Sequence, residues 1–355
     1  MRTTRQLSLG GVKIGGGAPV SIQSMTNTDT NDAEATLAQI RELAAAGCQI
    51  VRCAVPTIRT LDAFERICAE SPLPVVADVH FDHRIAIGAL ERGAACVRVN
   101  PGNLRGEAEA REVARTAARL GKPVRVGVNG GSLNREIAAR LGKTAQAMVE
   151  SAEYYIRIFE EEGCRALKVS LKSSDLRITL EACRMFAARS DIPLHIGLTE
   201  AGPVSSGIVK SSVAIGTLLL DGIGETIRVS LTAPPVEEIY AAQRILEAVG
   251  LRQASPEIIS CPTCGRTHGD MLSLVAQVER EVRRIQSSGK RIALRKIAVM
   301  GCEVNGPGEA SDADVGIACS AHGGILFKHG EKVATLEKAE LLSAMIRELE
   351  DATLR

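Results

Sequence analysis

The sequence contains no tryptophan and few other aromatic residues, and its charges nearly cancel. Aromatic residues make up 2% of the 355 positions, and 43 basic residues are matched by 42 acidic ones. A nucleic-acid-binding protein normally has an excess of basic residues or aromatic side chains on which bases stack. These absences argue against a nucleic acid partner, whereas a small phosphorylated ligand held by a local group of basic residues remains compatible with the composition.

A long apolar run is also missing. No stretch reaches the roughly 18 consecutive apolar residues of a membrane span, and the N-terminal MRTTRQLSLGG lacks the apolar core of a signal peptide. We therefore expect a cytoplasmic protein without a membrane partner. In that compartment ten cysteines do not indicate a disulfide framework, and most of them, such as Cys48, Cys68 and Cys183, lie in apolar helical patterns where we expect buried, inert thiols.

The first part of the chain repeats a strand–helix rhythm. Short runs rich in β-branched residues predict strands within 20–25, 50–55, 75–81, 96–103, 124–131, 167–174, 194–202 and 227–232. The helical segments between them often stop at a glycine, which readily adopts the left-handed conformation after a helix: Gly47, Gly93, Gly121, Gly163, Gly222 and Gly250. Eight such units favour a closed (β/α)₈ barrel of the TIM type over a doubly wound open sheet. We predict this α/β barrel over residues 1–256.

The rhythm breaks after a helix predicted at 234–250. Residues 251–260 (LRQASPEIIS) have the composition of a linker, and residues 257–355 predict a small α/β domain. Its expected elements are a helix at 270–287, strands at 295–300, 315–318 and 324–328, and a helix at 335–350. Near the N-terminus, GGVKIGGGAP (10–19) resembles a phosphate loop only in its glycines and predicts a β-turn.

Basic and polar residues recur at the predicted strand ends, where barrels of this type bind ligands. They are Arg52, Arg98, Asn100, Arg125, Asn129, Lys172, Arg228 and Ser230. Each arginine could pair with a neighbouring carboxylate, but five cations exceed the roughly two acids at these ends. Adjacent uncompensated guanidinium groups are costly unless an anion binds there. The pattern therefore predicts a polyanionic substrate, with a diphosphate favoured.

Three residues at the same strand ends are able to move protons: Asp78, His80 and Glu200. His80 could equally be a structural histidine. Glu200 directly follows a predicted strand, and we consider it the better acid or base.

Three cysteines lie in two glycine-containing motifs of the second domain. CPTCGRT supplies Cys261 and Cys264, and GCEVNGPGEA supplies Cys302. A zinc ribbon would need a second pair of ligands at short spacing, which is not present. A fourth ligand could be His268 or Glu309, the latter brought back by a turn at 305–308.

The identity of the fourth ligand bears on the kind of metal site. Cys319 fits better as a residue of a buried strand. Glu309 would hold an iron–sulfur cluster more weakly than a thiolate, leaving one iron open to a substrate oxygen. A structural zinc site has no use for such a ligand. The spacing favours a three-cysteine cluster and leaves zinc as the alternative.

Taken together, the motifs resemble those of the 4-hydroxy-3-methylbut-2-en-1-yl diphosphate synthase family. They are CPTCGRT, GCEVNGPGEA, VRVNPGN, VRVGVNGGSL, LKSSD, GLTEAG, GIVKSS and GIGETIRVSLT, and the resemblance extends from about residue 18 to about residue 320. It implies two-electron reductive ring opening and dehydroxylation of 2-C-methyl-D-erythritol 2,4-cyclodiphosphate, a step in isoprenoid precursor biosynthesis.

The resemblance also implies roles for individual residues. A [4Fe-4S] cluster would be held by Cys261, Cys264, Cys302 and Glu309. The cyclic diphosphate would be held by Arg52, Arg98, Arg125, Lys172, Arg228 and Ser230, with Asn100 and Asn129 nearby. Asp78 and His80 would lie around its carbon skeleton, and Glu200 matches the glutamate that acts as acid or base or orients the substrate. Electrons would come from reduced flavodoxin or ferredoxin, and the protein would be a homodimer in which one subunit's cluster domain caps its partner's barrel.

Two other functions remain compatible with the motifs. One is a non-redox barrel enzyme acting on a phosphorylated substrate, with a structural zinc-ribbon domain. The other is a scaffold whose metal domain recruits a partner. Iron, sulfide and zinc analysis separates both from the redox enzyme.

Overall fold

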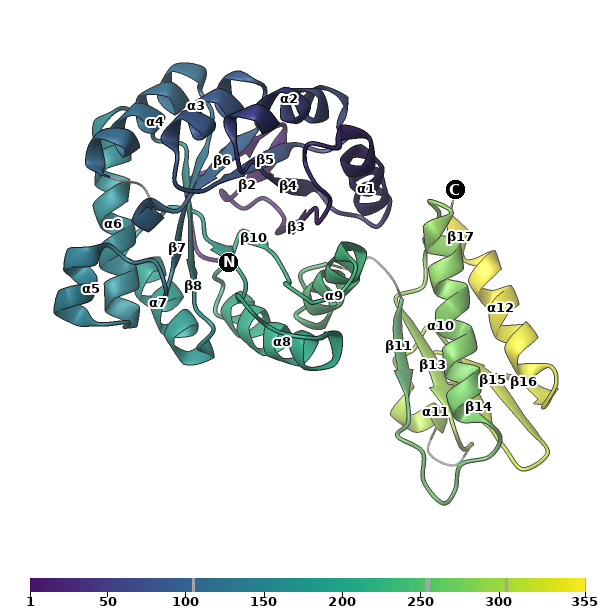
Figure 1. The fold of residues 1–355 in the computed structure, drawn as a ribbon. Helices are drawn as coiled ribbons and strands as arrows, with labels where there is room; N and C mark the ends of the chain where they lie inside the picture. The colour runs from purple at the N-terminus through teal and green to yellow at the C-terminus, as the bar shows by residue number, and fades with distance from the viewer. Residues whose placement is uncertain (104–105, 253–255, 304–305, 355) are drawn as a thin grey trace. The chain divides into compact units, whose positions relative to one another are not determined.

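The computed structural model describes residues 1–103, 106–252, 256–303 and 306–354. They form two compact units, Met1–Leu251 and Arg252–Arg355, which are treated separately below (Figure 1). The contacts divide the chain slightly before the boundary expected at residue 256. Of the linker predicted at 251–260, residues 253–255 lie outside the described residues, and Glu257–Ser260 is strand β11 instead.

Eight parallel strands of the first unit form a barrel, which confirms the predicted fold. They are β3 Ser21–Met25, β4 Ile50–Ala54, β5 Val75–Val79, β6 Cys96–Val99, β7 Val124–Asn129, β8 Leu167–Lys172, β9 His195–Ile196 and β10 Thr226–Ile227. Their order in the sheet is β8-β7-β6-β5-β4-β3-β10-β9. A parallel bridge between Val169 and Leu194 joins β8 to β9 and closes the ring, which an open sheet would not do.

Helices lie outside these strands (Figure 1). They are α1 Ala33–Ala45, α2 Leu61–Glu70, α3 His83–Glu91, α4 Glu107–Leu120, α5 Arg135–Leu141, α6 Ala145–Glu161, α7 Leu176–Arg189, α8 Val204–Leu220 and α9 Pro235–Ala248, with 3-10 turns at η1 Ile58–Thr60 and η2 Pro101–Asn103. Several begin at a capping side chain; Asp32, for example, accepts a hydrogen bond of 3.0 Å from Ala35 N at the start of α1. The six glycines predicted to end helices all have positive φ.

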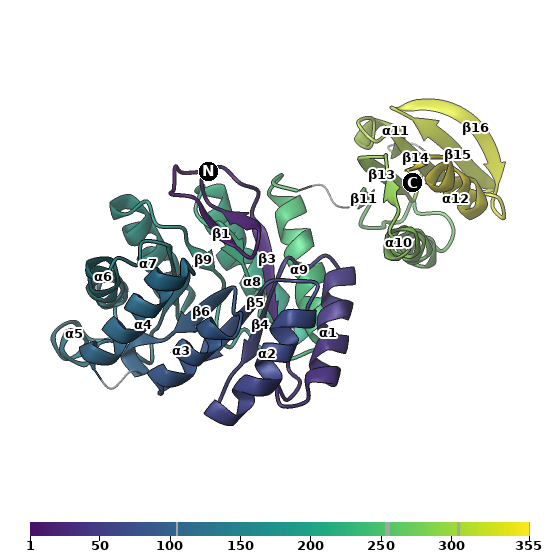
Figure 2. The same cartoon turned by 90° about the horizontal axis from the view of Figure 1, so that it is seen from above.

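A β-hairpin near the N-terminus covers one end of the barrel (Figure 2). Its strands, β1 Leu7–Leu9 and β2 Val12–Ile14, pair antiparallel around a turn at Gly10 and Gly11. Leu9 and Ile14 pack against Ile50 and Cys96, the first residues of β4 and β6. The turn predicted within 10–19 is therefore present, but the sequence pattern missed both strands. The hairpin buries the apolar N-terminal end of the barrel and leaves the opposite end for ligands.

The second unit is a five-stranded sheet with the two long helices, α10 and α12, on one face. Its strands are β11 Glu257–Ser260, β13 Lys296–Met300, β14 Val315–Cys319, β15 Gly323–Lys328 and β16 Glu331–Glu337, and its helices are α10 Met271–Ser287, α11 Gly306–Glu309 and α12 Leu341–Asp351. A short pair, β12 Arg291–Ile292 and β17 Thr353–Leu354, lies beside them. Residues of α10 and α12 share an apolar core with Val299 and Ile317, while Met300 and Phe327 belong to a second, smaller core.

Two local predictions in this unit are wrong. The helix expected from residue 335 starts at Leu341, because residues 331–337 pair with β15 as strand β16, with Thr335 opposite Ile325. Pairing with a neighbouring strand overrode the local helical pattern. The turn expected at 305–308 includes residue 305, which lies outside the described residues, and Gly306–Glu309 forms the short helix α11. Within the described parts of the chain, no helix has the length and apolar character needed to cross a membrane.

Candidate functional site

The C-terminal ends of the barrel strands surround two adjoining cavities. The inner cavity, of about 200 Å³, is lined by Arg52, Asp78, His80, Arg98, Arg125, Asn129, Ser170, Lys172, Leu198, Thr199, Arg228 and Ser230. The outer cavity, of about 470 Å³, shares His80, Asn129 and Thr199 and adds, among others, Asn100 and Glu200. All eleven barrel residues that the sequence singled out line one cavity or the other. The structure therefore brings them together, while their individual roles remain predictions.

Asp78 is the acid at the centre of the inner cavity. Its Oδ1 lies 3.2 Å from Arg98 Nη1, and its Oδ2 lies 3.8 Å from Arg52 Nε and 3.6 Å from His80 Nε2. Burial raises the pKa of this carboxyl, but Arg52, His80 and Arg98 together outweigh burial and hold the pKa well below its usual range. Asp78 is therefore an anion at neutral pH. It can fix guanidinium groups, but with so low a pKa it is neither a good proton acceptor nor a proton donor at neutral pH.

Arg228 has a different partner, which sequence reasoning missed. Glu238, a buried residue of α9, lies 3.1 Å from Arg228 Nη2 and 3.2 Å from Arg228 Nε. The same carboxylate accepts hydrogen bonds from Ser24 Oγ and from Leu231 N. The residues around Glu238 predict only a helix, and nothing in them indicates that this side chain contacts a residue at a strand end. The second buried acid of the site is thus Glu238, since Glu200 is exposed.

The remaining cations have less compensation. Arg125 is buried, and its Nε and Nη1 have no hydrogen-bond partner among the described residues. Burial, followed by the positive charges of Arg125 and Arg228, lowers the pKa of Lys172 well below its usual value. A bound anion would reverse both effects, because it supplies hydrogen-bond acceptors and negative charge. The inner cavity is thus built for an anion.

His80 and Glu200, the two groups best placed to transfer a proton, line the outer cavity. Arg98 Nη1 lies 3.1 Å from His80 Nε2, a ring nitrogen that also lies 3.6 Å from Asp78 Oδ2. Glu200 is exposed on the outer cavity and has a φ of 57°. Phe81, beside His80, has a φ of 67° and a side chain that is 66% exposed. Such backbone conformations are strained for these residues and are frequent at functional sites.

Several polar residues of the two cavities were not predicted. Ser170 and Thr199 line the inner cavity, and Lys143, Ser173 and Ser174 line the outer one. Ser170 precedes Lys172 by two positions on β8, so strand alternation could have identified it. Lys143 lies before α6, in a loop whose position the sequence pattern does not specify.

A glycine makes room for one of the arginines. A Cβ atom at Gly127, on β7, would lie 2.7 Å from Arg98 Nε. We expect Gly127→Ala to displace the Arg98 side chain without disturbing the barrel, because a flexible side chain can move. The Michaelis constant for the anionic substrate should then rise about tenfold, equivalent to one charge-assisted hydrogen bond of about 1.4 kcal/mol. Steady-state kinetics and circular dichroism check this; an unchanged Michaelis constant would mean that Arg98 does not need its present position.

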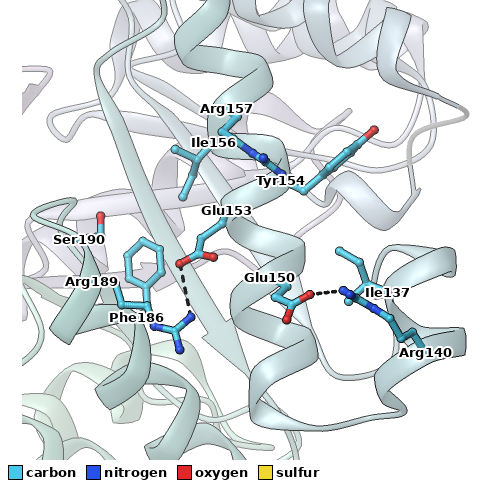
Figure 3. Close-up of a pocket in the computed structure, with 10 residues that line it drawn as sticks. All are labelled: Ile137, Arg140, Glu150, Glu153, Tyr154, Ile156, Arg157, Phe186, Arg189 and Ser190. Carbon is cyan, nitrogen blue, oxygen red and sulfur yellow. Dashed lines mark hydrogen bonds and ion pairs between the residues drawn. The ribbon is translucent and has the colours of Figure 1, made fainter.

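A third cavity lies on the outer surface of the barrel, among α5, α6 and α7 (Figure 3). Its volume is about 540 Å³. The two carboxylates that line it are both paired, Glu150 with Arg140 and Glu153 with Arg189. It is remote from the strand ends and its acids are neutralised locally. We therefore assign the active site to the inner and outer cavities.

The three motif cysteines lie in the second unit. Cys261 Sγ accepts a hydrogen bond of 3.1 Å from Gly301 N, and His268 N donates to Gly301 O at 2.8 Å. These bonds place the CPTCGRT loop against the residue that precedes Cys302. Cys264 and Glu309 are exposed. Within the described residues, three or more histidine, cysteine or acidic side chains are nowhere grouped closely enough to hold a metal ion.

The donor chemistry nevertheless fits an iron–sulfur cluster. None of the ten cysteines forms a disulfide, and a backbone N–H directed at a cysteine sulfur stabilises its thiolate form, as found around such clusters. Cys319, by contrast, is buried in β14 with its Sγ 3.9 Å from Met271 Sδ. This agrees with the expectation that Cys319 is a core residue. The assignment of Cys261, Cys264, Cys302 and Glu309 as ligands remains a prediction.

Comparison with known proteins identifies the family. Residues 4–243 match the GcpE TIM-barrel domain, and residues 257–351 match the GcpE protein C-terminal domain. The chain is 49% identical over 348 residues to the 4-hydroxy-3-methylbut-2-en-1-yl diphosphate synthase (flavodoxin) of Geobacter sulfurreducens, covering 98% of this chain and 97% of that protein. It is 47% identical to the enzyme of the same name from Thermodesulfovibrio yellowstonii, covering 98% of each.

Among solved structures, similarity is limited to the fold. The dihydropteroate synthase of Yersinia pestis matches with a TM-score of 0.50 and 14% identity, covering 70% of this chain and 99% of that one. The two domain matches and the similarity to curated enzymes over nearly the full length agree with the strand-end and cysteine motifs. The chain therefore belongs to the GcpE family, the family of 4-hydroxy-3-methylbut-2-en-1-yl diphosphate synthases.

Proposed function

We infer that this chain acts as a 4-hydroxy-3-methylbut-2-en-1-yl diphosphate synthase. It is an oxidoreductase that opens the ring of 2-C-methyl-D-erythritol 2,4-cyclodiphosphate by two-electron reduction and removes a hydroxyl, giving (E)-4-hydroxy-3-methylbut-2-enyl diphosphate. The observation that carries this inference is the inner cavity, in a chain similar to the curated enzymes over nearly its whole length. Five cations line this cavity with one carboxylate, Asp78, and a second buried carboxylate, Glu238, pairs with Arg228. A non-redox enzyme with a zinc ribbon is not favoured by that similarity.

The inner cavity holds the diphosphate in this proposal. Arg125 and Lys172 supply the least compensated charges and would contact phosphate oxygens directly. Asp78 fixes Arg52 and Arg98, while Glu238 fixes Arg228, so these guanidinium groups are held in place before the substrate arrives. Asn100, Asn129 and Ser230 complete the set of predicted polar contacts.

The outer cavity supplies the proton. One ring C–O bond breaks while the diphosphate stays attached at its other end, and the departing hydroxyl must take up a proton to leave as water. Glu200 and His80 lie at the cavity mouth and can deliver that proton from solvent. Asp78, held as an anion by its three neighbours, would keep His80 and Arg98 in position.

The second unit supplies the electrons. We propose that Cys261, Cys264, Cys302 and Glu309 would hold a [4Fe-4S] cluster, which, when bound, passes electrons singly and offers one weakly ligated iron. Support comes from the free thiols and from the Gly301 N–H directed at Cys261 Sγ. The curated relatives are named for flavodoxin, and we propose reduced flavodoxin, with ferredoxin as a substitute, as the electron donor.

Assembly and location complete the proposal. We expect a cytoplasmic homodimer in which each cluster-binding domain (residues 257–355) caps its partner's barrel (residues 1–256). Mixing a variant defective only in the barrel with one defective only in the cluster-binding domain tests the capping. Recovery of activity in the mixed dimer supports capping between subunits, and its absence would favour capping within one subunit.

The activity itself is tested with protein isolated without oxygen. Reduced flavodoxin and the cyclic diphosphate should yield the linear diphosphate, detected by mass spectrometry and phosphorus NMR. Iron and sulfide should be present in equal amounts. A colourless protein that contains zinc and leaves the cyclic diphosphate unchanged would refute the proposal.

Glu309 can be tested as the non-cysteine ligand. We expect Glu309→Gln to retain iron and sulfide but to lose at least about 100-fold in turnover, because three thiolates suffice for assembly and the carboxylate acts at the open iron. Asp312→Asn, three residues further along the chain and paired with Lys296, is the matched control and should behave as wild type. Wild-type turnover and an unchanged electron paramagnetic resonance spectrum in Glu309→Gln would remove Glu309 from the site.

A further inference from the structure

Beneath the inner cavity, the barrel interior holds polar side chains that the sequence analysis did not single out. Lys168 of β8, His195 of β9 and Gln23 of β3 are almost completely buried. Lys168 Nζ, both ring nitrogens of His195 and both amide atoms of Gln23 have no hydrogen-bond partner among the described residues. Buried polar groups in proteins are nearly always paired, so an unpaired set this deep in a core requires an explanation.

The position of Lys168 connects it to the anion site. Lys168, Ser170 and Lys172 alternate along β8 and therefore face the same side of the strand. Ser170 and Lys172 line the inner cavity, so Lys168 lies below them in the barrel. The strand register places Lys168 directly opposite Arg125 of β7, which has unpaired nitrogens of its own.

Among the described residues, the charged and titratable neighbours that shift the pKa of Lys168 include no carboxylate. Its charged and titratable neighbours are Arg125 on β7, Arg52 on β4 and Cys96 on β6, and His195 on β9 is in turn affected by it. Burial raises the pKa of the Cys96 thiol, which is therefore neutral. Burial likewise lowers the pKa of Lys168 to about 8, and the positive charges of Arg125 and Arg52 add to this shift.

Lys168, unlike Arg125, can gain or lose a proton when the pH changes or a ligand binds. A guanidinium group keeps its proton at any pH at which the protein is folded, so Arg125 and Arg52 stay charged. His195, whose pKa is lowered well below its usual value by burial and then by Lys172 and Arg125, stays neutral. Lys168 is thus the group in this layer whose charge can change near neutral and mildly alkaline pH.

We propose that Lys168 is a positioning residue for the substrate. In the substrate-free barrel at mildly alkaline pH it is a neutral amine, and it takes up one proton from solvent when the cyclic diphosphate enters the inner cavity. This rests on the proposed function, because the anion is the substrate's diphosphate. The negative charge favours the ammonium form of Lys168, and the ammonium strengthens anion binding beside Arg125. No bond other than the N–H bond forms or breaks.

The same arrangement predicts that the lysine destabilises the empty protein. Because the folded-state pKa lies below the unfolded value, the unfolded chain binds more protons between about pH 8 and about pH 10.5. The stability of the substrate-free protein therefore rises with pH through that window, and the full penalty of Lys168 is present below it. Lys168→Met should raise the melting temperature at neutral pH while it weakens substrate binding. A lysine kept only for packing would give a lower melting temperature.

Isothermal titration calorimetry tests the proposal. The holoenzyme, without an electron donor so that no turnover occurs, is titrated with the cyclic diphosphate in buffers of different ionisation enthalpy. The two phosphates of this substrate are diesters and do not titrate in the range used. We expect proton uptake to rise by about one proton between about pH 7 and about pH 9.5, in addition to any uptake by Lys172 that is already present at pH 7. In Lys168→Met this rise should disappear, with affinity about tenfold lower.

Matched variants decide between this lysine and its neighbours. His195→Gln should keep the rise in uptake. Lys168→Arg, which cannot release its proton, should bind without this rise even if Lys168→Met fails to fold. A rise of wild-type size in both Lys168 variants, or its loss in His195→Gln alone, would overturn the proposal. If the wild-type enzyme binds and converts the substrate without pH-dependent proton uptake, the proposal for Lys168 fails while the proposed function stands. If the substrate does not bind at all, the proposed function fails.

Discussion

Replacing Arg125 by methionine is expected to raise the dissociation constant of the cyclic diphosphate about 100-fold or more. Arg125 is buried, and two of its nitrogens have no partner among the described residues, so we expect the diphosphate to be their acceptor. Losing one side of such a buried charge pair costs about 3 kcal/mol or more, mostly because the remaining charge is left unpaired. Calorimetry in the absence of reductant measures the binding directly.

A second readout separates loss of the ligand contact from damage to the barrel. Without substrate, Arg125→Met should melt at the wild-type temperature or above, since an uncompensated guanidinium group is removed from the interior. Arg140→Met is the matched control: Arg140 is exposed and paired with Glu150 on the outer surface (Figure 3), so binding should not change. An unchanged dissociation constant in Arg125→Met would contradict the assignment of the inner cavity to the diphosphate.

The sequence predicted the barrel and the site because both depend on repeated local patterns. Strand ends converge in a parallel barrel whatever the detailed packing, so residues at those ends, such as Arg52, Arg125 and Lys172, could be grouped without coordinates. The glycines that end helices were also predictable, because positive φ is a local requirement. Both inferences needed only the regular alternation of strands and helices along the sequence.

What the sequence could not specify depends on contacts between distant segments. Glu238 reaches Arg228 from α9, and nothing in its helical surroundings distinguishes it from a solvent-exposed glutamate. The hairpin over the barrel end and strand β16 exist because partners elsewhere pair with them or pack on them. Lys168 could have been recognised from strand alternation, but its lack of a partner is visible only when the whole barrel interior is assembled.

The cysteine assignment leads to the other large effect. We expect Cys302→Ser to lose nearly all bound iron and sulfide, and with them all reductase activity, because two thiolates and one carboxylate do not retain a cluster. Cys302 follows Gly301, whose backbone donates to Cys261 Sγ, so the two motifs already lie side by side in the second unit. Iron and sulfide analysis and the visible absorption spectrum measure the loss without reference to turnover.

Cys319→Ser is the control that makes this result specific. Both changes replace one sulfur by oxygen, but Cys319 is 4% exposed in β14, and its Sγ faces Met271 Sδ inside the apolar core. We therefore expect Cys319→Ser to lower the melting temperature slightly, since a hydroxyl is buried without an assured partner, and to keep iron, sulfide and colour. If Cys319→Ser loses the cluster while Cys302→Ser keeps it, the ligand set is wrong, and Cys319 takes the place assigned to Cys302.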